Sequence, residues 1–327
     1  MAVAARARPD DYFTAEEWRS LTARSTWRGI WLVAHCWGVI AAAMLIGAIW
    51  PMTIPVAVIV IGTRQLGLFV LMHDAAHATL HVNRRVNDWV GLWLCSAGLR
   101  QYRPYHLQHH RFVQQTEDPD LVLSAPFPIS RASLVRKVLR DLSGQTFYKQ
   151  HFGHIAPAIR ARASGESALR RFWIELAKDK RYLLSNALGF MVFAAAGGWW
   201  IWLALWLLPT ICWLPLISRI RNIAEHALVG ANQADPLRQA RTTQANWLER
   251  TLIAPYWVNY HCEHHLFTNL PCWKLPAAHA ILSQRGTTAN MEIQPSYLTP
   301  APACHGQKHP PRHGDLNTLA RQHGPFS

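Results

Sequence analysis

The apolar residues of this chain are concentrated in three long blocks. The first block, residues 29–50, contains no charged side chain, and the second, residues 51–72, is interrupted only by Arg64 and Gln65. The third block, residues 182–217, holds no Asp, Glu, Lys or Arg. A helix that crosses a membrane needs about 20 apolar residues, so the third block suits two short spans. The pattern predicts an all-α integral membrane protein with four transmembrane helices in two hairpins, at about 29–50, 51–72, 182–197 and 198–217.

Shorter elements are predicted around these spans. Residues 14–17 read Thr-Ala-Glu-Glu, a capping-box pattern that predicts a short amphipathic helix in the N-terminal segment 1–28. The apolar run within residues 88–99 is too short to span, which favours an interfacial or re-entrant helix. Residues 131–181 are basic and helix-forming, which is typical of a helix on the membrane surface. We expect the membrane domain to cover residues 29–294, because the Pro- and His-rich residues 295–327 are typical of a disordered tail.

The distribution of Lys and Arg indicates the orientation of the spans. Residues 1–28 hold five of them, residues 73–181 hold seventeen and residues 218–327 hold ten, whereas the predicted hairpin turns hold none. Basic residues accumulate on the cytoplasmic side of membrane proteins. We therefore expect a multi-pass protein of the inner (cytoplasmic) membrane with both termini in the cytoplasm. Seventeen of the eighteen histidines lie on that same side.

Composition excludes several classes of protein. Only 16% of the residues are charged, against roughly a quarter in a typical soluble domain. The net charge of +14 fits attraction to anionic lipid, and no nucleic-acid-binding motif accompanies it. The six cysteines show no paired spacing, which predicts no disulfide framework. No apolar segment precedes residue 29, so we expect no cleaved signal peptide.

Three histidine clusters carry the chemistry that the sequence predicts. They read H-D-A-A-H at 73–77, H-L-Q-H-H at 106–110 and H-C-E-H-H at 261–265. Residues three or four apart share a helix face, so each cluster can direct two or three imidazoles at one spot. Eight histidines are too many for one metal of ordinary coordination number, and imidazole-rich sites suit iron, zinc or copper. We therefore expect two transition-metal ions in a cytoplasmic helical cap.

Two further histidines lie close to these clusters in the sequence. His81 extends the first cluster by one helical turn, and we expect it beside the metal site without binding the metal. His226 follows the fourth predicted span and is expected to supply a ninth imidazole. Asn222, one turn earlier, is the competing ligand or water-binding residue. Isolated histidines are expected to have no metal role; they are His35, His151, His154 and His279.

Carboxylates accompany the histidines. Metal-bound histidines usually donate their second N–H to a carboxylate or a carbonyl. The acids expected in this role are Asp74, Glu117, Asp118, Asp120, Glu225 and Glu263. Two alternatives stay open: residues 118–120 suit a plain turn, and Glu225–His226 suits a polar pair at the membrane interface.

The order of the clusters resembles the membrane fatty acid desaturase superfamily. The resemblance covers roughly residues 29–283 and rests on the strings HDAAHATLH, YRPYHLQHHRF, EDPDL, RNIAEH and NYHCEHHLF. These strings are most similar to bacterial desaturases of the dihydrorhizobitoxine-desaturase-like branch. The string HDAAH also resembles carotenoid hydroxylases and ketolases.

This resemblance implies a non-haem di-iron centre that uses dioxygen to introduce a C=C bond into a membrane-dissolved acyl chain. It implies two electrons from a separate ferredoxin or cytochrome b5 system with its reductase, because the chain has no H-P-G-G string of a fused cytochrome b5. We expect Arg136, Lys137 and Arg140 to dock that donor. The iron ligands carried over are His73, His77, His106, His109, His110, His226, His261, His264 and His265.

Two alternatives to desaturation are open at this point. One is hydroxylation, ketolation or oxidative decarboxylation of a lipid or carotenoid on the same metal site. The other is a metal transporter or metal sensor. Transport requires polar ligands inside the spans, and only Arg64 and Gln65 offer any.

Overall fold

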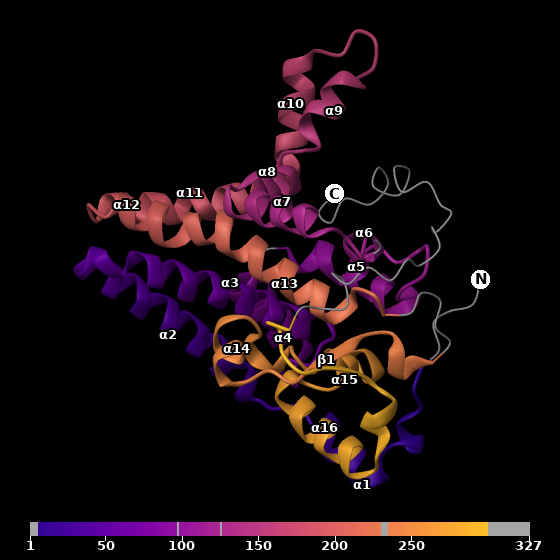
Figure 1. Cartoon of the computed structure of the whole chain (residues 1–327). Coiled ribbons are helices and arrows are strands. Elements are labelled where there is room, and N and C mark those ends of the chain that lie inside the picture. Colours follow the sequence, from indigo (N-terminus) through magenta and orange to yellow (C-terminus); the bar gives the residue numbers. More distant parts are fainter. Residues whose placement is uncertain (1–5, 97, 125, 230–234, 300–327) are drawn as a thin grey trace.

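Long apolar helices form one end of the molecule and shorter helices form the other (Figure 1). The computed structural model describes residues 6–299 apart from 97, 125 and 230–234. The long helices lie in two hairpins. The first consists of α2 (Arg28–Ile49), the 3-10 turn η2 (Pro51–Thr53) and α3 (Ile54–Ala76). The second consists of α11 (Lys180–Ala195), α12 (Trp199–Trp202), the π-helical segments η5 (Leu203–Leu207) and η6 (Pro209–Trp213), and α13 (Leu214–His226).

Three helical segments are long and apolar enough to cross a membrane: Arg28–Ile49, Pro51–Ala76 and Trp199–His226. The prediction of an α-helical membrane protein is confirmed to that extent. Helix α11 has 16 residues, or about 24 Å at 1.5 Å per residue. The span predicted at 182–197, which corresponds to α11, stays a prediction.

The two hairpins pack closely against each other. Gly62 of α3 faces Trp213, and a Cβ on this glycine would lie only 2.7 Å from Trp213 Cδ1. Small residues of this kind let membrane helices approach one another where no aqueous hydrophobic effect drives them together. This contact packs α3 against the continuous helical segment η6–α13, which ends at His226.

The last long helix extends well past the predicted end of the apolar block at residue 217. It continues to His226 because its charged residues have buried partners. Arg219 Nη2 donates to Asp141 Oδ1 at 2.8 Å, and the Asp141 side chain is fully buried. Arg221 pairs with Glu225 one turn later on the same helix. Charge therefore marks the end of the apolar block and not the end of the helix.

Arg64 lies inside a span and is nevertheless buried. Its Nη2 donates to Thr251 O at 2.6 Å, and the neighbouring Thr63 hydroxyl donates to Leu252 O at 2.8 Å. These carbonyls belong to the last turn of α14 (Trp247–Leu252), where helical carbonyls lack intrahelical partners and a cation is favoured. Gln65 Nε2 likewise donates to Trp206 O at 2.9 Å. The polar residues of this span dock neighbouring helices and do not line a metal path.

Most of the remaining elements surround the inner ends of the long helices, whereas the two helices between residues 155 and 176 project away from them (Figure 1). The α-helices among them are α1 (Ala15–Thr22), α4 (Arg84–Val90), α5 (Leu99–Phe112), α6 (Leu121–Ser124), α7 (Arg131–Leu142), α8 (Gln145–His151), α9 (Ile155–Arg160), α10 (Ala168–Leu176), α15 (His261–Leu266) and α16 (Leu275–Gln284). The predicted helix within 88–99 is α4 followed by the π-helical η3 (Gly91–Cys95). Short 3-10 turns are η1 (Pro9–Asp11), η4 (Ala177–Asp179), η7 (Pro236–Arg238), η8 (Pro255–Trp257), η9 (Cys272–Lys274) and η10 (Thr287–Asn290).

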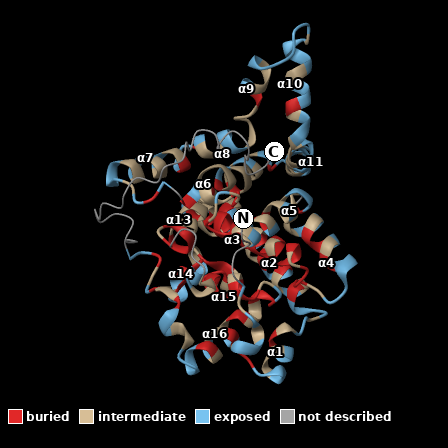
Figure 2. Cartoon of the chain, turned by 90° about the vertical axis from the view of Figure 1, so that its right-hand side faces the viewer, coloured by how far each residue is buried: buried red, intermediate tan, exposed pale blue. Residues whose placement is uncertain are grey.

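Buried residues concentrate where α3, α13 and α15 meet, whereas α7, α9 and α10 are largely exposed or half-buried (Figure 2). The predicted capping box is confirmed: Thr14 Oγ1 accepts from Glu17 N, and Glu17 Oε2 accepts from Thr14 N. Helix α1 then covers the segment after α15, because the rings of Phe13 and Trp18 lie 5.0 and 5.5 Å from that of Phe267.

A small parallel pair of strands is the one element class that the sequence pattern did not predict. Strand β1 (Arg241–Thr243) pairs with β2 (Glu292–Gln294). Packing continues beyond residue 294, since the Tyr297 side chain is buried and Ser296 donates to Glu249. Residues 300–327 of the expected tail lie outside the described residues. The five described cysteines are free, as expected.

Candidate metal centre

Nine histidines from four elements meet at the inner ends of the long helices. They are the nine that the sequence analysis named as ligands. Helix α3 and its C-cap carry His73 and His77, α5 carries His106, His109 and His110, α13 ends in His226, and α15 carries His261, His264 and His265.

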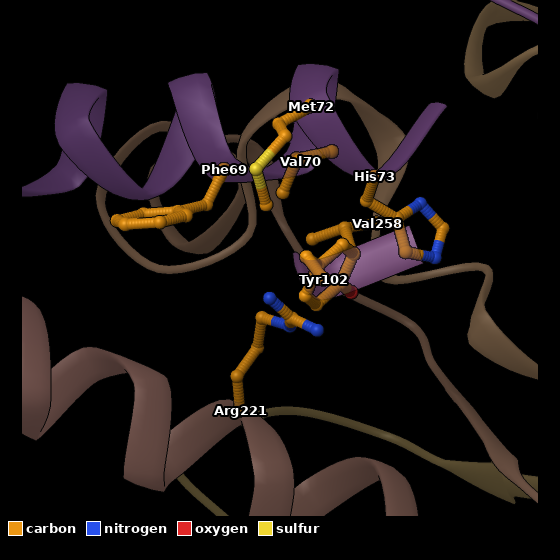
Figure 3. Close-up of a pocket in the computed structure, with 7 residues that line it drawn as sticks. All are labelled: Phe69, Val70, Met72, His73, Tyr102, Arg221 and Val258. Atoms are coloured by element: carbon orange, nitrogen blue, oxygen red, sulfur yellow. The ribbon is translucent and has the colours of Figure 1, made fainter. Parts of the chain in front are cut away.

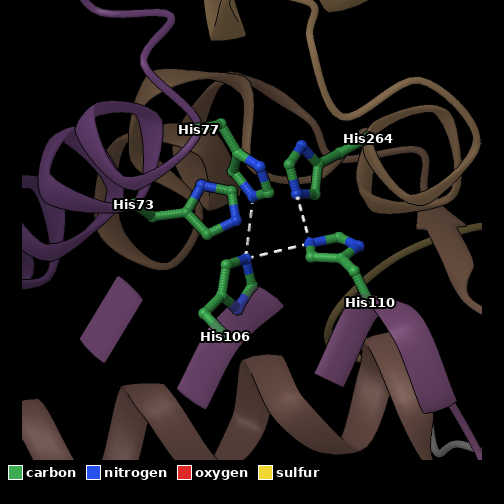
Figure 4. Close-up of side chains that lie close together, drawn as sticks. All are labelled: His73, His77, His106, His110 and His264. Carbon is green, nitrogen blue, oxygen red and sulfur yellow. Dashed lines mark hydrogen bonds between the residues drawn. The ribbon is translucent and has the colours of Figure 1, made fainter. Parts of the chain in front are cut away.

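Five of these histidines surround one point (Figure 4). One ring nitrogen of each lies within 4.8 Å of the others; the residues are His73, His77, His106, His110 and His264. His106 Nε2 is 3.0 Å from His77 Nε2 and 2.9 Å from His110 Nε2. His110 Nε2 is 3.0 Å from His264 Nε2. Imidazole nitrogens that face one another need a proton or a cation between their lone pairs.

The other four histidines form a second group. His109, His226 and His265 offer ring nitrogens within 4.8 Å of one another, and His261 joins them through His226 and Glu225. His261 Nε2 lies 2.8 Å from His226 Nε2 and 3.1 Å from His265 Nε2. The two groups are adjacent, because the ring centroids of His110 and His265 are 4.3 Å apart. The arrangement therefore offers two neighbouring sites.

The chemistry of both groups fits transition metals. His73 Nε2 and His226 Nδ1 are buried without a hydrogen-bond partner among the described residues, although buried polar atoms are normally paired. Burial also lowers the pKa of His106, His110 and His264 well below its ordinary value. These three imidazoles are therefore neutral, which is the form that binds a metal.

Asp118 orients His109. Its Oδ1 accepts from His109 Nδ1 at 2.8 Å and from Asp120 N at 2.9 Å, while its Oδ2 accepts from Gln114 N at 2.9 Å. Burial alone would lower the pKa of His109, but the Asp118 carboxylate outweighs burial and raises the pKa to about 9. The bond leaves His109 Nε2 directed at the second group, 3.4 Å from His265 Nε2. The residues 118–120 form a turn and support a histidine at the same time.

Asp74 and Glu225 flank the two groups. Asp74 Oδ1 lies 3.7 Å from His73 Nδ1, and its Oδ2 accepts from Cys272 N at 2.9 Å. Glu225 accepts from Arg221 through both oxygens at 2.7 and 2.8 Å. Its Oε2 also lies 3.6 Å from His261 Nε2. Glu225 is thus an ion-pair partner that borders the second group.

The structure differs from the expectation for His81. Helix α3 ends at Ala76, and Ala78 adopts a positive φ of 58°, so the helical face that joins His73 and His77 does not continue. The His81 ring turns outward instead and contacts Thr26 O at 2.9 Å. Asn222 is half-buried, and its side chain makes no hydrogen bond to the described residues. Glu117 is half-buried on the loop after α5, where its side chain accepts from Thr116.

Glu263 faces away from the histidine nitrogens. Its carboxylate is fully buried and accepts hydrogen bonds from Thr242 of β1 and from His279 of α16. The bond to Glu263 raises the pKa of His279, although burial opposes the rise. The sequence analysis gave His279 no role, because no local pattern connects it with the third cluster.

The chain matches the family model described as fatty acid desaturase over residues 48–297, which is more than half of its length. The chain belongs to the fatty acid desaturase family. The resemblance noted from the histidine strings is thereby confirmed, and this family member is an oxidoreductase. The family match thus favours the enzyme over the alternative of a metal transporter or sensor.

Several curated relatives of this family member have named activities. It is 28% identical over 246 residues to dihydrorhizobitoxine desaturase of Bradyrhizobium elkanii, covering 70% of this chain and 68% of that protein. It is 24% identical over 247 residues to the chloroplastic omega-6 fatty acid desaturase of Brassica napus, covering 68% and 52%. It is 24% identical over 266 residues to a beta-carotene ketolase of a Paracoccus strain, covering 80% and 86%. The chain thus spans about half the length of the plant desaturase.

A cavity beside the first histidine group gives this family member an apolar space next to the metal centre (Figure 3). Its volume is about 70 Å³. The apolar lining residues are Phe69, Val70, Met72 and Val258, and the other lining residues are His73, Tyr102 and Arg221. The Tyr102 ring stacks on that of His106 with 4.9 Å between centroids, so a residue that lines the cavity also holds a histidine of the first group in place.

Proposed function

We propose that this protein is a membrane-bound di-iron desaturase of acyl chains that uses dioxygen and two electrons from an external donor. The observation that supports this most strongly is the pair of adjacent histidine groups at the inner ends of apolar helices. Removal of two hydrogens from a saturated C–C bond, with two added electrons and two protons, reduces one dioxygen to two waters. Two irons bound in these groups would activate dioxygen, which is the oxidant of that reaction.

The histidines of this chain divide naturally between the two irons. The five-histidine group would hold one iron, with His73, His77, His106, His110 and His264. The second group would hold the other, with His109, His226, His261 and His265. Imidazole is a common iron ligand and is not consumed by the oxidation.

The residues around the irons have distinct tasks. Phe69, Met72 and Val258 line the cavity beside His73 and would exclude water from a bound methylene pair. Asp118 accepts from His109 Nδ1 and so orients the ring with its Nε2 toward the second group, where a bound metal would displace the Nε2 proton. The apolar lining supports an acyl chain as the substrate.

A ketolase or hydroxylase of a lipid or carotenoid is the second candidate. The match to beta-carotene ketolase over 86% of that protein favours it. Both reactions begin with loss of hydrogen from a carbon atom, and they differ in whether a second hydrogen leaves or oxygen is added.

Mass spectrometry of lipid extracts tests the proposal. Cells that express the chain should accumulate a lipid that has lost two hydrogens relative to cells without it. A product that has gained an oxygen would establish the second candidate instead. Unchanged lipids in cells with iron-loaded protein would contradict both.

We further propose four spans in two hairpins, with the catalytic face and both termini in the cytoplasm. Three spans are supported by length and composition. The remaining one, predicted at 182–197, is α11, which packs against α12 in the second hairpin. Reporter fusions at Ser164, between α9 and α10, and at Gly197, in the hairpin turn, should give opposite signals. Equal signals would contradict the two-hairpin topology.

The electron donor is proposed to be a small acidic protein such as a ferredoxin, or a cytochrome b5-type protein, with its reductase. Helix α5 offers it a short route, because exposed Leu107 and Arg111 directly adjoin His106 and His110 in sequence. Of the α7 residues expected to dock the donor, Arg136 is exposed, whereas Lys137 and Arg140 are half-buried. Burial together with Arg219 lowers the pKa of Lys137.

Salt and charge reversal test the docking surface. The apparent KM for an acidic ferredoxin should rise with ionic strength, because the Debye length falls from about 30 Å at 0.01 M to about 8 Å at 0.15 M. Reversal of Arg100 and Arg111 on α5 to Glu should raise this KM, whereas reversal of Arg136, Lys137 and Arg140 on α7 should change it less. Turnover with a small chemical reductant should be unaffected by either change. A larger effect of the α7 reversal would move the docking surface to α7.

A further inference from the structure

Helix α15 carries three of the proposed iron ligands and is only six residues long, His261–Leu266. An isolated helix of that length does not form in water, since helices shorter than about 12–15 residues are marginal even in favourable sequences. Its orientation therefore depends on contacts with neighbouring elements.

One such contact is made from the back of α15. His261, His264 and His265 face the metal groups, whereas Glu263 directs its carboxylate between β1 and α16. There it accepts from the Thr242 hydroxyl, and Thr242 Oγ1 in turn accepts from Cys262 N at 3.3 Å. Thr242 of β1 is therefore hydrogen-bonded to two consecutive residues of α15, Cys262 and Glu263.

The second half of this contact is His279. Its Nδ1 donates to Glu263 Oε1, and its ring lies against Tyr260 with 5.2 Å between centroids. The Glu263 side chain is fully buried, and His279 is its only ion-pair partner among the described residues. Thr242 donates to Oε2, so loss of His279 would leave the buried Oε1 without a donor. An unsatisfied buried carboxylate oxygen is costly, so Glu263 would turn toward water and α15 would turn with it.

We propose that His279 is a positioning residue of the metal centre, which holds the third histidine cluster in place through Glu263 and Thr242. This inference rests on the proposed di-iron function. His279 touches neither ligand nitrogens nor the cavity, so its effect is transmitted through the helix. Partners that orient metal ligands typically contribute 10–100-fold to metal affinity.

Iron affinity measured against a competing chelator tests the proposal in purified full-length protein. His279→Ala should weaken the affinity by roughly 10–100-fold, while the helical circular dichroism stays that of the wild type. His279→Asn should restore most of the affinity, because an amide N–H can replace the Nδ1 donor. Thr242→Val should weaken affinity in the same direction. The matched control is Gln284→Ala, an exposed residue on the same helix.

The outcomes separate this inference from the function on which it rests. If the wild-type protein binds no iron, the proposed function fails. If the wild type binds two irons and His279→Ala binds them equally tightly, only the positioning role is overturned. A loss in His279→Ala that Asn does not restore, or an equal loss in Gln284→Ala, would also overturn it, since either result would point to general destabilisation of α16.

Discussion

Replacing His264 with alanine is expected to abolish turnover and to reduce the iron bound by the purified protein. His264 Nε2 lies 3.0 Å from His110 Nε2 within the five-histidine group, and the residue is buried. The alanine variant lacks one nitrogen donor of this buried group. Neither water nor another side chain would be an equivalent donor in its place. The loss of activity should exceed about 100-fold, because changes to the outer partners of ligands alone cost roughly 10–100-fold.

Product formation and iron content per chain measure this effect together. His81→Ala is the matched control, since His81 belongs to the same sequence run as His73 and His77 but contacts Thr26 O outside the site. It should retain both iron and turnover. Full activity in His264→Ala would remove the basis of the metal assignment.

The second large effect is expected at His226. Its Nε2 lies 2.8 Å from His261 Nε2, and its ring is buried among the second group. His226→Ala should therefore lose activity and iron to the same extent as a change within the three clusters. Asn222→Ala should have a small effect, because the Asn222 side chain makes no hydrogen bond to the described residues.

The two substitutions discriminate between the ligands that the sequence left open. Spectroscopy of the iron-loaded variants provides a readout besides turnover, because loss of an imidazole changes the ligand field of one iron only. A severe defect in Asn222→Ala with a mild one in His226→Ala would reverse the assignment.

Helical spacing was sufficient to predict that each cluster directs its histidines toward one region, because positions three and four apart share a face. Histidines four apart stay in the same group, as in 73/77, 106/110 and 261/265, whereas His109 and His264 each join the other group. Helical spacing could not predict that His264 joins His73 in one group while its neighbour His265 joins His109 in the other. That division depends on how α15 lies against α5, which is a property of tertiary packing.

Other differences have equally physical causes. The end of α3 at Ala76 removes His81 from the site, and nothing in the local sequence breaks the pattern before it. The last long helix passes residue 217 because Arg219 and Arg221 find carboxylate partners that no hydropathy pattern reveals. The sequence did not predict a role for His279, because His279 meets its partner Glu263 only when α16 packs behind α15.

The pairing of α1 with Phe267 has a consequence for biosynthesis. Helix α1 packs against Phe267, which is synthesised much later, and each histidine group likewise combines histidines made before the second hairpin with histidines made after it. The first hairpin is therefore synthesised before either group is complete. A metal that needs all of these histidines would be bound only after α15 has been synthesised.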